Sequence, residues 1–453
     1  MRQKKSKVFS PIVQPFQRFF SIEASSGVVL IVAMIIALVW ANSKWADQYF
    51  SFINYDLTIQ VGNIFKLSKP LILWINDGLM GIFFFVVGLE IKREVMIGEL
   101  SSLKQASLPI IAALGGMIMP ASIFILLHHN QPGQEGWGIP MATDIAFSLG
   151  ILSLLGKRVP LSLKIFLTAF AIADDLGAVL IIAFFYSSQI YWNMVLIALA
   201  IYLLLAILMY VGLRNWLVFF MISTMVWYYF LKSGIHPSFA GVLLALIVPV
   251  SRKIRVPAFS RLMRENLDDF CEDECEDQII LTKDQLASVD NMEKYIEAVQ
   301  SPLQSLEHRM HGFVSYLVIP LFALANAGIV FTLGGDGSIF SNLTLNLALA
   351  LLFGNLIGIF GFSWLGVKLR LAVLPDRTSW VHILGIGLLG GIGFTMSIFI
   401  SGLAYHEASQ FLNQAKIGII LGSLIAGIAG YLLLRITLKD TAKLKAEVSE
   451  HDS

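Results

Sequence analysis

Hydrophobic residues run through the chain in long blocks that are separated by short polar stretches. About twelve of these blocks are long enough to cross a bilayer as helices, since roughly 20 residues suffice. Their approximate bounds are 24–42, 71–91, 107–127, 136–155, 161–186, 193–212, 215–231, 235–250, 312–333, 344–367, 381–404 and 414–436. The pattern predicts an all-α polytopic membrane protein whose connections are short, except for residues 251–311.

Positive charge alternates between successive connections. Lys and Arg occur in the N-terminal segment, in the second, fourth, sixth, eighth and tenth loops and in the C-terminal tail, whereas the third, fifth and ninth loops contain neither. The first loop, with Lys44, Lys66 and Lys69, departs from this alternation. Because Lys and Arg are retained in cytoplasmic loops, both termini are predicted to be cytoplasmic, which requires an even number of spans.

Residues 256–306 break the apolar pattern with the acidic run DDFCEDECEDQ and then a helix-like stretch, QLASVDNMEKYIEAVQ. Cys271 and Cys275 in the acidic run could bind a metal, but charge runs are usually solvated, so we favour an exposed linker. The predicted parts are a membrane domain in two pieces, 1–255 and 307–438, the acidic cytoplasmic insertion 256–306, and a cytoplasmic tail 439–453.

Composition supports this class of protein. The 453 residues are 57% hydrophobic and 14% charged, and the mean hydropathy is +0.75. A soluble globular protein of this length does not have such a composition. The net charge of +1 gives no reason to expect nucleic-acid binding.

Two adjacent carboxylates, Asp174 and Asp175, lie at the centre of the apolar block 161–186. As a helix this block is about 39 Å long, so both acids fall near the bilayer midplane. A charged residue there costs at least ~2.5–3.5 kcal/mol on insertion scales. The pair is therefore interpreted as functional, and the alternative is an acid paired with a basic residue of another helix.

Two of the apolar blocks are interrupted by residues that disfavour a continuous helix. The first, GIPMATDIAFSLGIL, contains Pro140, Thr143 and Asp144, and the second is GLLGGIGFTMSIF. The second carries the glycines Gly391 and Gly393 and the hydroxyl residue Thr395. Interrupted spans in corresponding places of two halves indicate a transporter site built on inverted repeats. We expect Asp144 to offset the partial positive charge of half-helix N-termini there; close helix packing is the alternative for the glycines.

Other polar residues at the ends of apolar blocks are weaker candidates. Asp77 in WINDGLMGIFF either lines a cavity or pairs with a polar neighbour. Two further groups lie at cytoplasmic ends, and taken alone they are typical of charged helix ends at the membrane interface, although His can titrate near neutral pH. These groups are Glu90, Arg93 and Glu94, and Glu307, His308 and His311.

The interrupted blocks and acidic pair together resemble the bacterial NhaA-type Na⁺/H⁺ antiporters. The matching motifs are GLEIKREV (88–95), ATDIAFSLGIL (142–152), AIADDLGA (171–178), LKSGIHPSFAGV (231–242), VIPLFALANAG (318–328) and GGIGFTMSIFI (390–400). They occur in the family's order from about residue 15 to residue 436, with the acidic insertion outside the match. This family is itself one of the examples of inverted-repeat transporters, so its architecture is implied by the resemblance.

The resemblance implies a role for each matching residue. Asp174 and Asp175 correspond to the pair that binds the ion and the protons, and Thr143 and Asp144 correspond to the crossing of two unwound helices. The cytoplasmic funnel associated with pH control corresponds to Glu90, Arg93, Glu94, Glu307, His308 and His311, and His236 corresponds to a further histidine linked to pH response. The family's tenth span usually carries a Lys in a GKPLGI-like motif, where this chain has Asn355 in GNLIGI. A homodimer in the bacterial inner membrane is also implied.

The expected function is exchange of cytoplasmic Na⁺, with Li⁺ as an alternative ion, for external H⁺, in pH and sodium homeostasis. One site that holds either Na⁺ or protons suffices for exchange, and no cofactor is expected. An intramembrane aspartyl protease also needs two membrane carboxylates, but they face each other from different helices. Adjacent residues of one helix point about 100° apart, and no GxGD motif is present. A cation channel is the third alternative.

Overall fold

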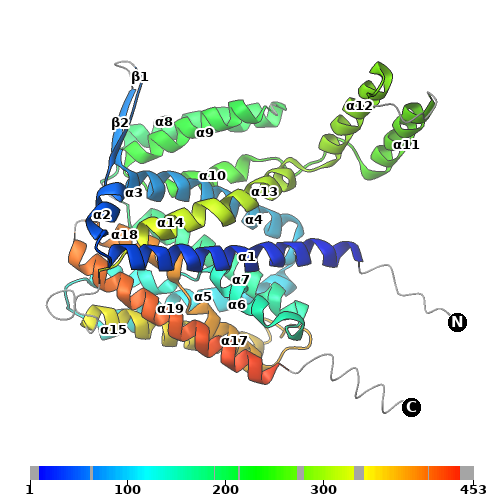
Figure 1. Ribbon diagram of the computed structural model, residues 1–453. Coiled ribbons are helices and arrows are strands. Elements are labelled where there is room, and N and C mark those ends of the chain that lie inside the picture. Colours follow the sequence, from blue (N-terminus) through cyan, green and yellow to red (C-terminus); the bar gives the residue numbers. More distant parts are fainter. Residues whose placement is uncertain are drawn as a thin grey trace, which may run out of the picture.

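The protein is built almost wholly of helices, most of which run along one common direction (Figure 1). The computed structural model describes residues 10–61, 65–187, 189–212, 215–272, 280–330, 341–406 and 408–438. The first described residues of the chain and the last ones lie at the same end of the bundle (Figure 1). This arrangement fits an even number of membrane crossings.

The elements follow one another in chain order, with short 3₁₀ or π-helical turns denoted η. They are α1 (Ser10–Ala41), α2 (Ala46–Ile53), β1 (Asp56–Val61), β2 (Phe65–Pro70), α3 (Leu71–Leu73), η1 (Trp74–Leu79), α4 (Met80–Ile97), η2 (Glu99–Ser101), α5 (Leu103–Leu127), η3 (Gln134–Met141), α6 (Ile145–Leu154), η4 (Gly156–Arg158), α7 (Leu161–Phe185), α8 (Trp192–Val211), α9 (Trp216–Ser233), α10 (Ser238–Ile247), α11 (Val256–Glu272), α12 (Lys283–Val299), α13 (Pro302–Phe313), η5 (Val314–Val318), α14 (Ile319–Asn326), α15 (Asn342–Leu349), η6 (Ala350–Gly354), α16 (Asn355–Lys368), α17 (Trp380–Gly390), α18 (Phe394–Ala404) and α19 (Ser409–Thr437).

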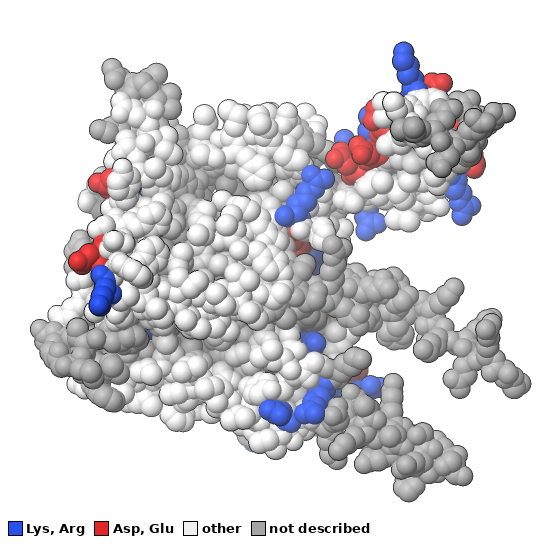
Figure 2. All heavy atoms as spheres, in the orientation of Figure 1, with Lys and Arg blue, Asp and Glu red and all other residues white. Residues whose placement is uncertain are grey.

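The predicted membrane architecture is confirmed. Within the described residues, eight helices are long and apolar enough to cross a membrane, or up to ten if each of two bent helix pairs counts as one span. Each predicted block contains helix in its described part, although the block 235–250 yields the ten-residue helix α10, which is short for a full crossing. Charged side chains gather at the two ends of the molecule and leave a broad uncharged band between them (Figure 2).

The helix that carries the acidic pair, α7, lies inside the bundle. It packs against α5, α6, α4 and α17, and both carboxylates are at most 2% exposed. Nearby, α5 and α16 approach closely at Gly115 and Gly358, where a Cβ on either residue would collide with the carbonyl oxygen of the other. Small residues at such crossings are the usual basis of tight helix packing in membranes.

Both predicted interruptions are present as breaks between half-helices. η3 ends at Met141 and α6 begins at Ile145, with residues 142–144 extended between them. α17 and α18 are separated by residues 391–393 and bend by 43°. Each break leaves backbone N–H and C=O groups unpaired within its own segment.

The described parts of the acidic insertion are mostly helical. α11 and α12 pack against each other and project beyond the rest of the bundle (Figure 1). The helix-like stretch corresponds to α12, whose first turn is held by a capping box between Thr282 and Gln285. The sequence analysis did not anticipate α11, because its first turns share no long apolar block. Cys275 and the rest of 273–279 lie outside the described residues.

Candidate functional site

The two breaks cross and are joined by hydrogen bonds through their backbones. The backbone N–H of Asp144 donates to the carbonyl of Ile392 (2.7 Å), and the hydroxyl of Thr143 donates to the carbonyl of Gly390 (2.9 Å). Ser397 Oγ donates to the carbonyl of Ile139 (2.8 Å). The crossing therefore satisfies groups that each broken helix leaves open by itself.

One carboxylate serves the N-termini of both half-helices that begin at the crossing. Asp144 is the N-cap of α6, and its Oδ1 accepts the backbone N–H of Phe147 (3.0 Å). Its Oδ2 accepts both the backbone N–H and the hydroxyl of Thr395 in the first turn of α18 (3.0 and 2.6 Å). The carboxylate of Asp144 thus lies where the N-termini of two half-helices meet, and its role in offsetting their partial positive charge stays a prediction.

The carbonyl ends of the other two half-helices are met by uncharged donors. The Asn355 amide donates to the carbonyls of Pro140 and Leu351 (both 3.1 Å), and Ser148 Oγ donates to that of Leu389 (2.9 Å). Asn355 is fully buried, and its Oδ1 has no hydrogen-bond partner in the described part of the chain. Asn355 therefore supports the crossing without adding a charge.

The acidic pair stands directly beside the crossing. Asp174 Oδ2 accepts the backbone N–H of Thr143 (3.0 Å), while its Oδ1 is buried and has no partner among the described residues. Asp175 faces a small cavity instead. Neither carboxylate has a Lys or Arg ion-pair partner in the described ranges. The alternative in which one acid pairs with a basic residue of another helix therefore finds no support there.

The small cavity has a volume of about 50 Å³. Its walls bring together Asp175, Thr143, Asp144 and Thr395 from the crossing with Glu90 and His311 from the predicted funnel. A cavity needs roughly 10–15 Å³ to hold one water molecule, so this one has room for a few particles of the size of water. Residues that are up to 305 positions apart in the chain thus line one space inside the helix bundle.

The predicted funnel residues form a network of ion pairs at one end of α4. Arg93 contacts Glu94 (2.7 Å) and Glu307 (2.9 Å), and His311 Nδ1 lies 3.4 Å from Glu90 Oε1. Burial raises the pKa of Glu307 to about 7, although the guanidinium of Arg93 opposes that rise.

Two of the predicted histidines lie outside this network. His308 is exposed on α13. His236 is at the opposite end of α4, where its Nε2 is 3.8 Å from Asp77 Oδ1 and its Nδ1 contacts Ser238 Oγ (2.7 Å). Asp77 also pairs with Lys69 (2.7 Å), so this acid has polar neighbours and does not line the small cavity. Thirteen residues of helix separate Asp77 from Glu90, which corresponds to about 20 Å.

The glycines of the second break are required by close approach. A Cβ on Gly393 would lie 2.7 Å from the carbonyl oxygen of Ala142, and one on Gly391 would lie 2.8 Å from that of Leu351. The sequence analysis assigned no role to Ser148, Ser397 or Ser423, although Ser397 belongs to the second interrupted block. The hydroxyl of Ser423 accepts the N–H of Gly393 (3.2 Å). The sequence feature that could have identified Ser148 and Ser397 is a hydroxyl residue within about one turn of a break. For Ser423 it is a hydroxyl residue within an otherwise apolar span.

No group of three or more His, Cys, Asp or Glu side chains within the described residues is arranged to hold a resident metal ion. The metal alternative for the acidic insertion depended on Cys271 and Cys275. Their side chains lie outside the described residues.

Comparison with known proteins identifies the family of the chain. A sequence model of the family described as Na⁺/H⁺ antiporter 1 matches residues 17–434. The Na⁺/H⁺ antiporter NhaA of Bacteroides thetaiotaomicron is 45% identical over 434 residues, covering 94% of this chain and 98% of the relative. NhaA 1 of Saccharophagus degradans is 44% identical over 430 residues (94% and 92%), and NhaA of Oleidesulfovibrio alaskensis is 44% identical over 437 residues (96% of each). These relatives are transporters and not enzymes, which disfavours the protease alternative. The chain is a multi-pass bacterial membrane protein that belongs to the Na⁺/H⁺ antiporter 1 family.

Proposed function

We propose that this chain exchanges cytoplasmic Na⁺ for external H⁺, with Asp174 and Asp175 binding Na⁺ and protons in competition. The observation that carries the proposal is the burial of both carboxylates, without basic partners among the described residues, beside the helix crossing. An ionised carboxylate in that position needs a cation, and a proton or Na⁺ can supply it. Exchange then follows because one occupant must leave before the other binds.

The crossing offers the oxygen ligands that Na⁺ needs in place of its hydration shell. Asp175 faces the cavity, Asp174 Oδ1 has no hydrogen-bond partner among the described residues, and Thr143 of the break lines the same cavity. Unwound segments of broken helices supply Na⁺ ligands in transporters of this architecture. Asp144 holds the N-terminal half-helices around this site and adds negative charge near the ion.

The cavity gives this conformation one open direction. It extends from Asp175 toward Glu90 and His311, at the end of α4 that we assign to the cytoplasm. On the other side of the site, Phe399 packs against Phe84 and Phe322, with ring centroids 5.7 and 6.1 Å apart. We assign this arrangement to the state that admits cytoplasmic Na⁺, and movement of the crossing helices would open the aromatic side.

The charge moved per cycle depends on the two acids, because Asn355 cannot titrate. If both acids release protons to one Na⁺, exchange moves net charge. If Asp174 keeps one protonation state throughout, one proton exchanges per Na⁺ and no net charge moves. We favour the first alternative because both carboxylates are buried next to the same break.

The funnel network is proposed to adjust activity to pH. Arg93 holds Glu94 and Glu307 together, and Glu307 changes charge near neutral pH. His311 beside Glu90 connects this network to the ion cavity. His308 and His236 remain candidates from the resemblance, but their positions argue for roles apart from this network.

The setting of the protein completes the proposal. The alternating Lys and Arg content of the loops supports a protein of the bacterial inner membrane with both termini on the cytoplasmic side. Li⁺ is a candidate substrate because the proposed ligands are hard oxygens. We also propose a homodimer and a role in pH and sodium homeostasis, both by analogy with the family.

A vesicle assay tests the exchange. Everted membrane vesicles are acidified by respiration, and addition of Na⁺ should dissipate the pH gradient. Asp175→Asn removes a carboxylate ligand without adding bulk, so it should abolish this response while insertion into the membrane is retained. Asp77→Asn is the matched control, because that acid does not line the cavity and lies about 20 Å along the helix from Glu90. Full Na⁺-dependent dissipation by Asp175→Asn would refute the assignment.

A further inference from the structure

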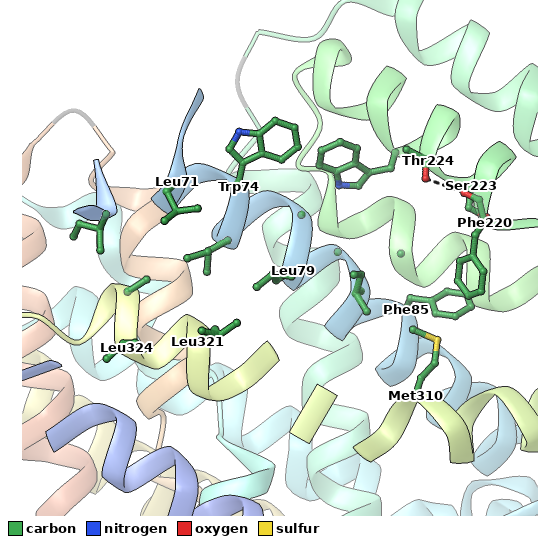
Figure 3. Close-up of a pocket in the computed structure, with 18 of the residues that line it drawn as sticks. Leu71, Trp74, Leu79, Phe85, Phe220, Ser223, Thr224, Met310, Leu321 and Leu324 are labelled. Atoms are coloured by element: carbon green, nitrogen blue, oxygen red, sulfur yellow. Dashed lines mark hydrogen bonds between the residues drawn. The ribbon is translucent and has the colours of Figure 1, made fainter. Parts of the chain in front are cut away.

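A large apolar cavity lies outside the ion site. Its volume is about 570 Å³, which falls within the roughly 300–1,000 Å³ typical of ligand pockets. Figure 3 shows Phe85 from α4, Phe220 from α9 and Leu321 and Leu324 from α14 around this space. The corner between α1 and α2 closes it further. The exchange mechanism makes no use of this cavity.

The shape of the cavity is that of a slot. Its wall follows one continuous helical stretch from Leu71 to Phe85, a rise of about 21 Å. The cavity is thus elongated along α3, η1 and the start of α4. An elongated apolar slot of this length suits one flexible hydrocarbon chain.

The chemistry of the wall is also that of a hydrocarbon site. Trp227 Nε1 donates to the carbonyl of Asp77 (3.1 Å), Thr224 Oγ1 to that of Phe220 (2.8 Å), and the Tyr49 hydroxyl to that of Leu324 (2.7 Å). These polar groups are satisfied within the protein and leave ring and methylene surface toward the cavity. Ser223 Oγ is buried and has no hydrogen-bond partner within the described chain. A ligand with several polar groups would find few partners here.

The position of the slot determines what reaches it. It lies within the membrane-spanning stretches Leu71–Ile97 and Trp216–Ser233. Its rim includes Phe52, Phe220 and Leu321, which are 57%, 39% and 37% exposed. At this depth the surrounding medium is the hydrocarbon of the bilayer. We propose that this slot binds one acyl chain of a membrane phospholipid.

Gly78 provides a direct way to fill the slot. It lines the cavity, and a Cβ built on it meets no atom within 4 Å. Gly78→Leu should therefore fold while its side chain occupies the space of the acyl chain. Gly361 on α16 is the matched control, because its Cβ also meets nothing within 4 Å and it does not line this cavity. Leu321→Trp, from the opposite wall, is a second filling variant.

The test uses phosphatidylglycerol that carries a photoreactive diazirine on one acyl chain, mixed into nanodiscs of phosphatidylethanolamine and phosphatidylglycerol. After irradiation, peptides from α9 are analysed by mass spectrometry for adducts, and peptides from α8 serve as an internal standard. Leu203 and Leu204 of α8 are 58% and 53% exposed and report lipid around the protein in general. We expect adducts at Ser223 and Trp227 that fall at least fivefold in Gly78→Leu and in Leu321→Trp, with Gly361→Leu unchanged.

Two results would overturn the proposal. Equal labelling of α8 and α9 in all four proteins would mean that only general surrounding lipid is present. Loss of dimers in Gly78→Leu with unchanged α9 labelling would mean that a second copy of the chain, rather than lipid, uses this face. The readout does not depend on transport, so it is independent of the proposed exchange.

Discussion

The carboxylate of Asp144 accepts hydrogen bonds from the first turns of both α6 and α18, so its removal should affect two half-helices at once. Asp144→Ala leaves the N–H of Phe147 and the N–H and hydroxyl of Thr395 without their acceptor. Asp144→Asn keeps one acceptor oxygen, but its amide nitrogen cannot accept a hydrogen bond. The asparagine variant should therefore still cap one of the two half-helices.

The expected magnitude follows from this count. Loss of an N-cap acceptor costs about 0.5–2 kcal/mol, so two capped ends predict a loss of about 1–4 kcal/mol in the free energy of unfolding for Asp144→Ala. Asp144→Asn should lose about half as much. At roughly 2 °C per kcal/mol for a chain larger than 150 residues, the melting temperature should fall by about 2–8 °C in the alanine variant.

Thermal unfolding in detergent, followed by tryptophan fluorescence at one fixed scan rate, measures this effect. Asp77→Ala is the control, because Asp77 and its partner Lys69 have side chains that are 14% and 25% exposed. A pair that water partly reaches contributes about 0–1 kcal/mol. The order of stability should be wild type, then Asp77→Ala close to it, then Asp144→Asn, then Asp144→Ala.

The outcome discriminates between two roles of Asp144. If Asp144→Ala is no less stable than Asp77→Ala, the reasoning about shared helix ends is wrong. If stability is unchanged while the Na⁺ concentration for half-maximal exchange rises, Asp144 acts on the ion and not on the half-helices. Loss of both indicates that the crossing must be intact before the ion binds.

Three further predictions concern charge, pH and the insertion. In proteoliposomes at symmetric pH, the wild type should generate a Na⁺-driven potential. Absence of this potential, with ΔpH coupling intact, would contradict two-proton exchange. Asn355→Lys in the same assay shows whether that position sets the charge balance. The pKa of Glu307 is raised to about 7, so the folded state keeps the Glu307 proton between about pH 4.5 and 7, where the unfolded state loses it. The unfolding temperature should therefore fall as pH rises through that range, and it should fall less in Glu307→Gln. Equal slopes of unfolding temperature against pH in the two proteins would contradict this. Replacing 258–295 by a Gly/Ser linker keeps Ala298, whose carbonyl accepts the N–H groups of residues 253 and 254. This variant should preserve exchange in vesicles, since the entropic cost of closing a loop changes slowly with its length. Inactivity at every pH would show that α11 and α12 are needed for transport.

Much of the architecture was predictable because membrane helices carry a strong one-dimensional signal. Blocks of about 20 apolar residues directly indicate helices, and Pro140, Gly391 and Gly393 indicate where two of them break. The insertion was harder, because the apolar residues of α11 alternate with polar and charged ones, and only its last residues, from 268, belong to the acidic run. An amphipathic helix that packs against a neighbour of similar pattern has no long apolar block to reveal it.

The candidate site was predictable only as far as charge in an apolar block reveals it. Asp144, Asp174 and Asp175 stood out because each is costly in a membrane. The serines did not, since a hydroxyl in a membrane helix usually bonds its own backbone, as Ser122 does with the carbonyl of Ile118. Ser148 and Ser397 instead reach across to the other broken helix. Only the three-dimensional crossing distinguishes these two uses of a hydroxyl.

The crossing also explains what the asparagine at position 355 can and cannot replace. Its amide reaches the carbonyl end of η3, so the hydrogen bond that a lysine would supply there is retained. The positive charge is not retained, and the remaining carbonyl ends are met by the hydroxyls of Thr143, Ser148 and Ser397. Asp144 is therefore the only ionisable side chain among these groups, and the only charge it can carry is negative. A cation that arrives at Asp174 and Asp175 meets no opposing positive side chain from the crossing, so its attraction depends on how many protons the two acids already hold.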